Sequence, residues 1–264
     1  MRRVLITGAS SGIGKEFAHS FGSRGFDLVL TARSEDALKQ LKDELIDEYH
    51  IAVDYVCADL LSEEGADSVY RYCKDNDISV AVLVNNAGFG DYGVFMDCDI
   101  EKQLKMIDLN CKALIHMTYL FLPDMKEKGY GKILNVGSIA SFMPGPYMSV
   151  YYATKAFVLS FSLALREELR DHNIGVVTLC PGPTNTSFAK NAEATNAKVF
   201  DKLFGRDPQK VAEYGYKLFA ENKAYGVEGL LNKTGAFFGR LLPPALAAKA
   251  VAYVQSKSRN KEKD

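Results

Sequence analysis

The sequence of 264 residues lacks an excess of charge of either sign, because 32 lysines and arginines nearly balance 33 aspartates and glutamates. A near-neutral chain does not carry the positive field with which proteins bind nucleic acids, so no nucleic-acid partner is expected. A long apolar run is also missing: residues 245–254 are interrupted by Lys249 and are too few to span a bilayer. The apolar run at residues 4–6 is too short for a secretory signal. A transmembrane span is therefore not expected.

Paired cysteines and metal-ligand spacings are missing as well. The five cysteines are scattered without a CxxC pair, and the four histidines are not at metal-binding intervals. An odd number of separate cysteines is typical of reduced thiols in a protein core. We therefore expect no metal site, and we expect the protein to be cytoplasmic.

Short apolar runs alternate with longer segments of helical periodicity along most of the chain. The expected strands cover residues 4–7, 28–32, 52–57, 80–84, 132–136 and 176–180. The expected helices cover residues 12–24, 34–49, 62 onward, 100–122 and 151–170, the fourth of them ending at Pro123. This alternation predicts an α/β fold, a Rossmann-like doubly wound parallel sheet in three α/β/α layers, as a single domain over residues 1–264. Such a sheet binds its ligands beyond the carboxyl ends of its strands.

The regular alternation ends after residue 181. Residues 183–240 carry few strand signals and are expected to form a substrate loop and a C-terminal helical lid. Within them, Asp207 and Pro208 are the residue types that begin a helix. Residues 257–264 are all polar or charged and are expected to be frayed.

A glycine-rich turn joins the first expected strand to the first expected helix. Its sequence is Thr7-Gly8-Ala9-Ser10-Ser11-Gly12-Ile13-Gly14. Glycines let a chain turn sharply and bring its backbone close to a phosphate, and the free N–H groups at a helix start attract anions. A turn in this position favours the binding of a dinucleotide.

Polar motifs follow the later strands, where a parallel sheet places its ligand site. They are Asn85-Asn86-Ala87-Gly88, Ser138 and Pro181-Gly182, with Asp59 after the third strand and Asn110 within the long expected helix. Together with glycines in the order GxxxGxG, these motifs resemble those of the short-chain dehydrogenase/reductase family over residues 1 to about 190. The resemblance implies an oxidoreductase that uses a nicotinamide dinucleotide.

The YxxxK pair of that family is present at Tyr151 and Lys155, thirteen residues after Ser138. The same string begins at Tyr70 and at Tyr253, but neither of these tyrosines has a serine thirteen residues before it. The interval to Ser138 therefore selects Tyr151 as the candidate proton donor.

The resemblance implies a catalytic group made of Ser138, Tyr151, Lys155 and Asn110. Tyr151 is expected to donate a proton to a carbonyl oxygen that Ser138 binds, while the nicotinamide supplies a hydride. Lys155, one helical turn away, is expected to lower the pKa of Tyr151 and to hold the nicotinamide ribose. Asn110 is expected to help hold a water that leads protons to Lys155. The implied cofactor-binding residues are Gly8, Ser10, Ser11, Gly12, Ile13, Gly14, Arg33, Asp59, Leu60, Asn86, Ala87, Gly88, Tyr151, Lys155, Pro181, Gly182, Thr184 and Thr186.

The end of the second expected strand indicates which nicotinamide cofactor is bound. NAD-binding members place an acidic residue there for the ribose hydroxyls, but here Asp27 stands at the opposite end of that strand. Arg33 follows the strand directly, and its guanidinium can pair with a 2′-phosphate. Ser34 adds a hydroxyl or only caps the next helix. We therefore expect NADP(H) as the cofactor and a reversible reduction of a carbonyl by NADPH.

Apolar side chains dominate the loops expected near the nicotinamide. They are Phe89, Tyr92, Phe142, Met143, Tyr147 and Phe188, beside Ser138 and Tyr151. They indicate an apolar ketone or aldehyde, such as a steroid, fatty-acyl or xenobiotic carbonyl, although packing against the core explains several of them equally well. For residues 226–244 a lid, an oligomer contact and a membrane-facing patch all stay open. The family resemblance implies a homodimer or homotetramer.

Two alternative functions are compatible with the same fold. An NAD-linked alcohol dehydrogenase is disfavoured by Arg33. A non-catalytic NADP(H)-binding sensor is expected to lack Ser138, Tyr151 or Lys155, and all three are present. The sequence therefore favours an NADPH-dependent oxidoreductase with a small-molecule carbonyl substrate.

Overall fold

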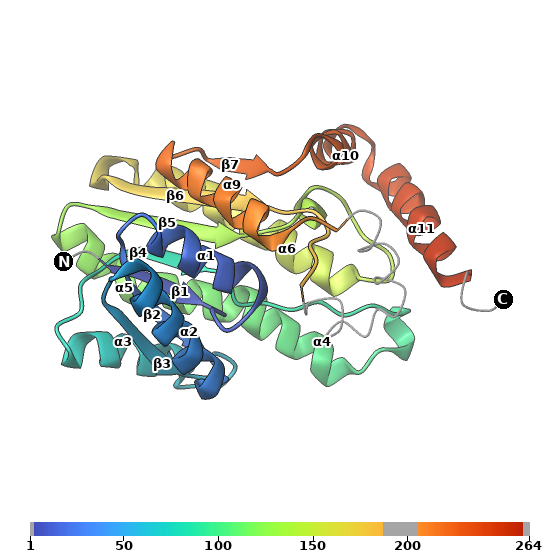
Figure 1. The fold of residues 1–264 in the computed structure, drawn as a ribbon. Helices are drawn as coiled ribbons and strands as arrows, with labels where there is room; N and C mark the ends of the chain where they lie inside the picture. The colour runs from blue at the N-terminus through green and yellow to red at the C-terminus, as the bar shows by residue number, and fades with distance from the viewer. Residues whose placement is uncertain (1–2, 187–204, 261–264) are drawn as a thin grey trace.

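Seven parallel strands form one sheet at the centre of the protein (Figure 1). The computed structural model describes residues 3–186 and 205–260. The strands lie in the order β3 (Val53–Cys57), β2 (Asp27–Ala32), β1 (Arg3–Thr7), β4 (Val80–Asn85), β5 (Gly131–Val136), β6 (Ile174–Cys180) and β7 (Tyr225–Val227). The chain winds outward from β1 in both directions, which confirms the doubly wound Rossmann-like fold. The strand order reverses between β1 and β4, the point where such sheets bind their ligands.

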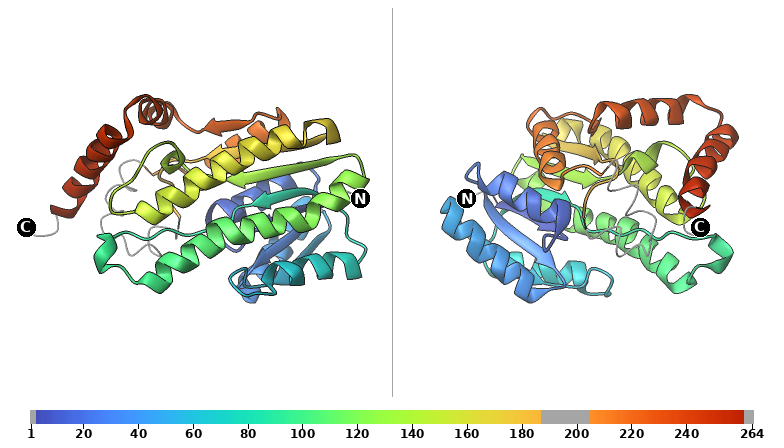
Figure 2. Two further views of the ribbon diagram at one scale, coloured as in Figure 1. Left: turned by 180° about the vertical axis from the view of Figure 1, so that it is seen from behind. Right: turned by 45° about the vertical axis from the view of Figure 1, so that its right-hand side comes forward.

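Helices cover both faces of the sheet, as the opposed views in Figures 1 and 2 show. One face packs against α1 (Gly12–Gly22), α2 (Glu35–Tyr49) and α9 (Pro208–Ala220). The other face packs against α3 (Gly65–Asp75), α5 (Leu114–Glu127) and α6 (Ser149–Glu168). Every residue of β4 is buried, and this burial on both faces is the physical reason for its continuous apolar run. The three-layer prediction is confirmed.

The long helix expected over residues 100–122 consists of three pieces. It comprises α4 (Ile100–Ile107), a π-helical segment η2 (Asp108–Ala113) and α5, which continues through Pro123 to Glu127. The prediction that Pro123 ends the helix is therefore wrong. A proline removes the hydrogen bond to the carbonyl four residues earlier, which belongs to Tyr119. Pro123 and Tyr119 are both exposed, so water can take the place of the missing donor.

The sequence suggested that residues 183–240 form a substrate loop and a lid, but two elements within this range belong to the core of the fold. Helix α9 packs against the core through Val211 and Phe219, and β7 is the seventh strand of the sheet. Three residues are enough for β7 because it pairs only with β6 at the edge, and so short a strand leaves little periodicity in the sequence.

The chain ends in two helices beside this core, α10 (Leu230–Leu241) and α11 (Pro244–Asn260). The start of the expected frayed tail, residues 257–260, belongs to α11. The described parts of the chain contain no helix with the length and apolarity that a membrane crossing needs.

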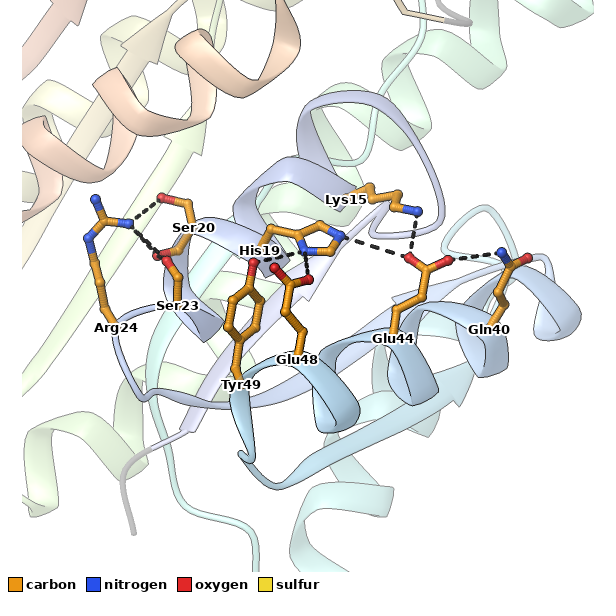
Figure 3. A network of polar contacts seen from close by, with 9 residues as sticks. All are labelled: Lys15, His19, Ser20, Ser23, Arg24, Gln40, Glu44, Glu48 and Tyr49. Carbon is orange, nitrogen blue, oxygen red and sulfur yellow. Dashed lines mark hydrogen bonds and ion pairs between the residues drawn. The ribbon is translucent and has the colours of Figure 1, made fainter.

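A network of polar side chains fixes α2 against α1 (Figure 3). Lys15 Nζ donates to Glu44 Oε2 at 2.8 Å, and the His19 ring nitrogen Nδ1 lies 3.3 Å from Tyr49 Oη. The bond from Lys15 lowers the pKa of the Glu44 carboxyl, although burial opposes this shift. The network joins the second half of α2 to α1, the helix that directly follows the glycine turn.

Candidate active site

The glycine turn after β1 is a close-packed cradle. Gly8 and Gly12 adopt φ angles of +65° and +55°, which favour glycine. A Cβ atom on Gly14 would lie 2.2 Å from the Gly8 carbonyl oxygen, so only glycine fits there. Ser11 precedes α1 at the N-cap position, and its side chain makes no capping bond. Hydrogen-bond donors are therefore present where a pyrophosphate would fit. They come from the N–H groups of the first turn and from Ser10, Ser11 and Ile13.

The loop after β4 is hydrogen-bonded directly to this cradle. Thr7 Oγ1 accepts from the backbone N–H groups of Asn86 and Ala87, both at 3.0 Å. Asn86 Nδ2 in turn donates to the carbonyl oxygens of Thr7 at 2.9 Å and Gly8 at 3.2 Å. Two motifs almost eighty residues apart in the sequence thus form one surface at the strand reversal.

Arg33 lies at the carboxyl end of β2, where the sequence placed it. Its side chain is exposed, and among the described residues its guanidinium has no hydrogen bond or ion pair. Ser34 occupies the N-cap position of α2 but makes no capping bond through its hydroxyl. Asp27 accepts from the Ala52 N–H at 2.9 Å at the far end of the strand, so it cannot serve a ribose at this edge. The two residues directly after β2 therefore offer a cation and a hydroxyl.

The remaining expected cofactor residues lie along the same edge. Asp59 Oδ1 accepts from the Leu61 N–H at 3.0 Å, which orders the loop that includes Leu60. Thr184 Oγ1 donates to the Gly182 carbonyl, which follows Pro181, at 3.0 Å. A Cβ on Gly12 would lie 3.0 Å from the Thr186 methyl, so the segment after β6 touches the glycine turn.

Ser138 and Tyr151 are hydrogen-bonded to each other through their side chains. Ser138 caps the short helix η3 (Ile139–Phe142), and its Oγ accepts from the Ala140 N–H at 3.1 Å. Burial raises the pKa of Tyr151 to about 12, and the bond from Ser138 opposes this shift only in part. The expected lowering of the Tyr151 pKa by Lys155 is therefore not found, because removal from water dominates at this phenol.

Lys155 is buried one helical turn after Tyr151. Its Nζ donates to the Val136 carbonyl oxygen at 2.9 Å and lies 5.9 Å from the centre of the Tyr151 ring. Burial lowers the pKa of this ammonium to about 8. A Cβ on Gly88 would lie 3.6 Å from Lys155 Nζ and 2.7 Å from Asn110 Oδ1, so the absence of a side chain at Gly88 brings the three together.

Asn110 lies in the π-helical segment η2 and is only 2% exposed. Its Oδ1 accepts from the Phe89 N–H at 3.0 Å, and its Nδ2 donates to the Phe89 carbonyl at 2.9 Å and to Thr154 Oγ1 at 3.1 Å. The side chain thus clamps the loop after β4 to helix α6. Single-turn π segments occur often at functional sites, because the extra residue redirects side chains. The water that Asn110 is expected to hold stays a prediction.

The expected substrate residues differ in their surroundings. Phe142 is 8% exposed and packs with Cys180 and Val227 in a small core, so for this side chain the packing explanation is right. Tyr92 and Tyr147, by contrast, stack partly exposed with ring centres 6.1 Å apart.

Three expected substrate residues remain. Met143 lies against Gly239 of α10, and Phe89 is fixed through its backbone by Asn110. Phe188 lies outside the described residues.

Sequence reasoning missed two residues that close this region. Gln255 of α11 donates through Nε2 to Tyr152 Oη at 3.1 Å, and its carbonyl accepts from Tyr92 Oη at 3.2 Å. Asn232 of α10 lies against Gly182. Their types carry no signal, and they are distant in sequence from the residues they contact. Within the described ranges, no cluster of His, Cys, Asp and Glu is suited to hold a metal ion.

Comparison with known proteins places this site in a family. The model of the short chain dehydrogenase family matches residues 2–197. Sulfoacetaldehyde reductase 2 from Chromohalobacter salexigens is 37% identical over 203 residues, which cover 76% of this chain and 80% of that enzyme. Very-long-chain 3-oxoacyl-CoA reductase from Bos taurus is 32% identical over 213 residues, which cover 78% of this chain and 67% of that enzyme.

A solved structure is similar over nearly the whole fold. The short-chain dehydrogenase from Sphingobium yanoikuyae in complex with NADPH aligns with a TM-score of 0.82 and 33% identity, covering 90% of this chain and 93% of that one. Sequence and structure agree on the same conclusion. The chain belongs to the short-chain dehydrogenase/reductase family of oxidoreductases.

Proposed function

We propose that this protein reduces the carbonyl of an apolar ketone or aldehyde to an alcohol with NADPH, in a reversible reaction. The observation that carries the proposal is the pairing of Tyr151 with Ser138 beside the glycine cradle. A phenol whose pKa is raised to about 12 is protonated at neutral pH, as a proton donor for reduction must be. The protein thus supplies the proton, and NADPH, when bound, supplies the hydride.

Ser138, Tyr151 and Lys155 would each have a separate role in the reaction at the carbonyl oxygen. The Ser138 hydroxyl would bind that oxygen and hold it near Tyr151 Oη. As the Tyr151 proton moves to the oxygen, negative charge would appear on the phenol. The Lys155 ammonium, whose Nζ is 5.9 Å from the ring centre, would stabilise this charge.

The cofactor would be held along the strand edge already described. The glycine cradle and the start of α1 would hold the pyrophosphate, and Lys155 would hold the nicotinamide ribose. Arg33 would pair with a 2′-phosphate through its guanidinium, which has no partner among residues 3–186 and 205–260. The NADPH in the Sphingobium relative supports the same choice of cofactor.

The substrate class is inferred from the side chains around Tyr151. Tyr92, Tyr147 and Met143 present mainly apolar surface there. The named relatives reduce carbonyl compounds as different as sulfoacetaldehyde and a very-long-chain 3-oxoacyl-CoA, so their names fix the reaction type better than the substrate. We propose a fatty-acyl, steroid or xenobiotic carbonyl.

A second copy of the chain is the proposed partner, in a cytoplasmic homodimer or homotetramer. An apolar groove between the helices that carry Asn110 and Tyr151 supports this assembly. Ile107, Ile115 and Phe157 line it and are each about two-fifths exposed. Light scattering coupled to size exclusion, on wild type and Phe157→Glu, would test it: the variant is expected to be monomeric.

The test of the reaction is loss of NADPH absorbance with a panel of ketones and aldehydes. Tyr151→Phe is expected to lose turnover on the order of 10²-fold or more while its thermal unfolding stays near wild type. Tyr70→Phe is the matched control, since Tyr70 begins the same YxxxK string but packs against Phe121 of α5. Near-normal turnover in Tyr151→Phe would refute the assignment. NADPH binding without turnover of any carbonyl compound would favour the alternative that the protein is a non-catalytic NADP(H)-binding sensor.

The test of the cofactor compares NADPH with NADH in Arg33→Ala. The variant is expected to lose about tenfold or more in NADPH affinity, as a lost charge-assisted pair implies, while NADH affinity stays unchanged. Lys39→Ala, which removes an exposed lysine within α2, is the control. Equal affinities for both cofactors in the wild type would contradict the proposal.

A further inference from the structure

Helix α10 carries its large apolar side chains on the outside of the protein. The outward residues are between 58% and 76% exposed. They are Leu230, Leu231, Phe237, Phe238 and Leu241. The positions that face the body hold small or polar residues instead, namely Asn232, Ala236 and Gly239. A helix on the surface of a soluble domain usually has the opposite arrangement, with its large apolar side chains against the core.

The contacts of the inner face fix this orientation. Ala236 is buried in the small core of Phe142 and Val227. Asn232 Nδ2 donates to the Glu228 carbonyl at 2.8 Å, and Arg240 Nη1 donates to Tyr225 Oη at 2.9 Å. The helix therefore cannot turn its phenylalanines inward without breaking these contacts.

Helix α11 extends the same apolar surface. Leu246, Tyr253 and Val254 are all more than half exposed, whereas Ala247 is buried and Gln255 is bonded to Tyr92 and Tyr152. Figures 1 and 2 show the two helices next to each other at one end of the protein, α11 beyond the carboxyl ends of the strands. Exposed apolar side chains are thus present on both of the neighbouring helices at this end of the protein.

The charge on this face is of one sign. From Gly229 to Ser256 the sequence has no aspartate or glutamate, although acidic residues make up 33 of 264 in the whole chain. It has Lys233, Arg240 and Lys249, all three exposed. Lys233 and Arg240 lie near the rings of Tyr214 and Tyr225, so on α10 these cations border the apolar face. Exposed apolar side chains among cations, without acidic residues, complement the surface of a membrane that contains anionic lipids.

We propose that α10 and α11 form a membrane-docking surface that lies flat in the headgroup region of a bilayer rich in anionic phospholipid. The leucines and phenylalanines would enter the acyl boundary, and the bordering cations Lys233 and Lys249 would pair with headgroup phosphates. A symmetric pairing of this face with a second copy would bring cations against cations with no acidic residue between them, so charge disfavours that occupant. The proposal does not depend on the reductase activity.

The test is sedimentation of the full chain with extruded vesicles of phosphatidylglycerol and phosphatidylcholine, or of phosphatidylcholine alone. The wild type is expected to bind the anionic vesicles and to bind phosphatidylcholine at least about tenfold more weakly. Phe237→Ser/Phe238→Ser should weaken binding about tenfold or more, and Lys233→Glu/Lys249→Glu should also do so, since each lost cation costs about fivefold. The matched controls are Met96→Ser, an 85% exposed apolar residue elsewhere, and Lys126→Glu on α5.

Circular dichroism and light scattering keep the outcomes distinct. Variants that stay folded, keep the wild-type oligomeric state and lose vesicle binding support the proposal. Failure of the wild type to bind anionic vesicles would overturn it. So would equal binding by the Phe237/Phe238 variant, or a change of that variant to a smaller oligomer, which would make the face a subunit interface.

Discussion

Replacement of Asn110 by alanine should destabilise the whole fold as well as slow the reaction. The wild-type side chain makes three hydrogen bonds, two to the backbone of Phe89 and one to Thr154, and it is almost fully buried. Alanine leaves the Phe89 N–H without its acceptor, which costs about 1–3 kcal/mol, and loses two further bonds of about 1 kcal/mol each. A total of about 3–5 kcal/mol corresponds to a Tm lower by roughly 6–20 °C in a protein of this size.

The assay combines thermal unfolding with amide hydrogen exchange at Phe89. We expect the Phe89 amide to exchange faster in Asn110→Ala, because the loop after β4 loses its clamp to helix α6. Asn76→Ala is the control, since Asn76 bonds only to the exposed end of its own helix α3. A variant with unchanged Tm and unchanged Phe89 exchange, but little turnover, would refute this reasoning. It would leave Asn110 with a role in proton transfer alone.

Three other predictions follow from the described contacts. Since the pKa of Lys155 is lowered to about 8, the charged form is lost as the pH rises through 8, and the rate of carbonyl reduction should fall there; a flat rate to pH 10 would contradict this. Gly14→Ala should weaken NADPH binding, followed by fluorescence, by about tenfold or more because its methyl would meet the Gly8 carbonyl, whereas Gly235→Ala, with open space around it, should not. Glu44→Gln should lower the free energy of unfolding, measured in urea, by under about 1 kcal/mol, because the bond between Glu44 and Lys15 is partly exposed. This difference in stability should exist above pH 4.5 and vanish as the pH falls below it, since the pKa of Glu44 is lowered in the folded state.

Local patterns were sufficient to predict six of the seven strands and to select the candidate catalytic residues. The buried strands are continuous apolar runs, and Ser138, Tyr151 and Lys155 stand at intervals that only one of three YxxxK strings satisfies. Arg33 was found because its position after β2 follows from the strand itself. These features are encoded within short stretches of chain.

Features that depend on tertiary contacts were missed or misjudged. The sequence places Lys155 one turn from Tyr151 and so suggests a lowered phenol pKa, but burial, which no short stretch encodes, raises it. Phe142 looks like a substrate contact until the core around it is seen. Gln255 reaches Tyr152 across 103 residues and belongs to no motif.

The π-helical segment η2 has a consequence for how the chain can change in length. A π turn holds one residue more than the α-helical turn it replaces, so it amounts to an insertion absorbed inside a helix. Removal of one residue between Asp108 and Ala113 should therefore restore a regular helix without moving the two flanking helices, whereas the same deletion within α6 would rotate every later side chain by about 100°. Such a shortened chain would keep its fold but lose the Asn110 clamp. At this place in the sequence, therefore, the length of the helix is set by the site and not by the requirements of packing.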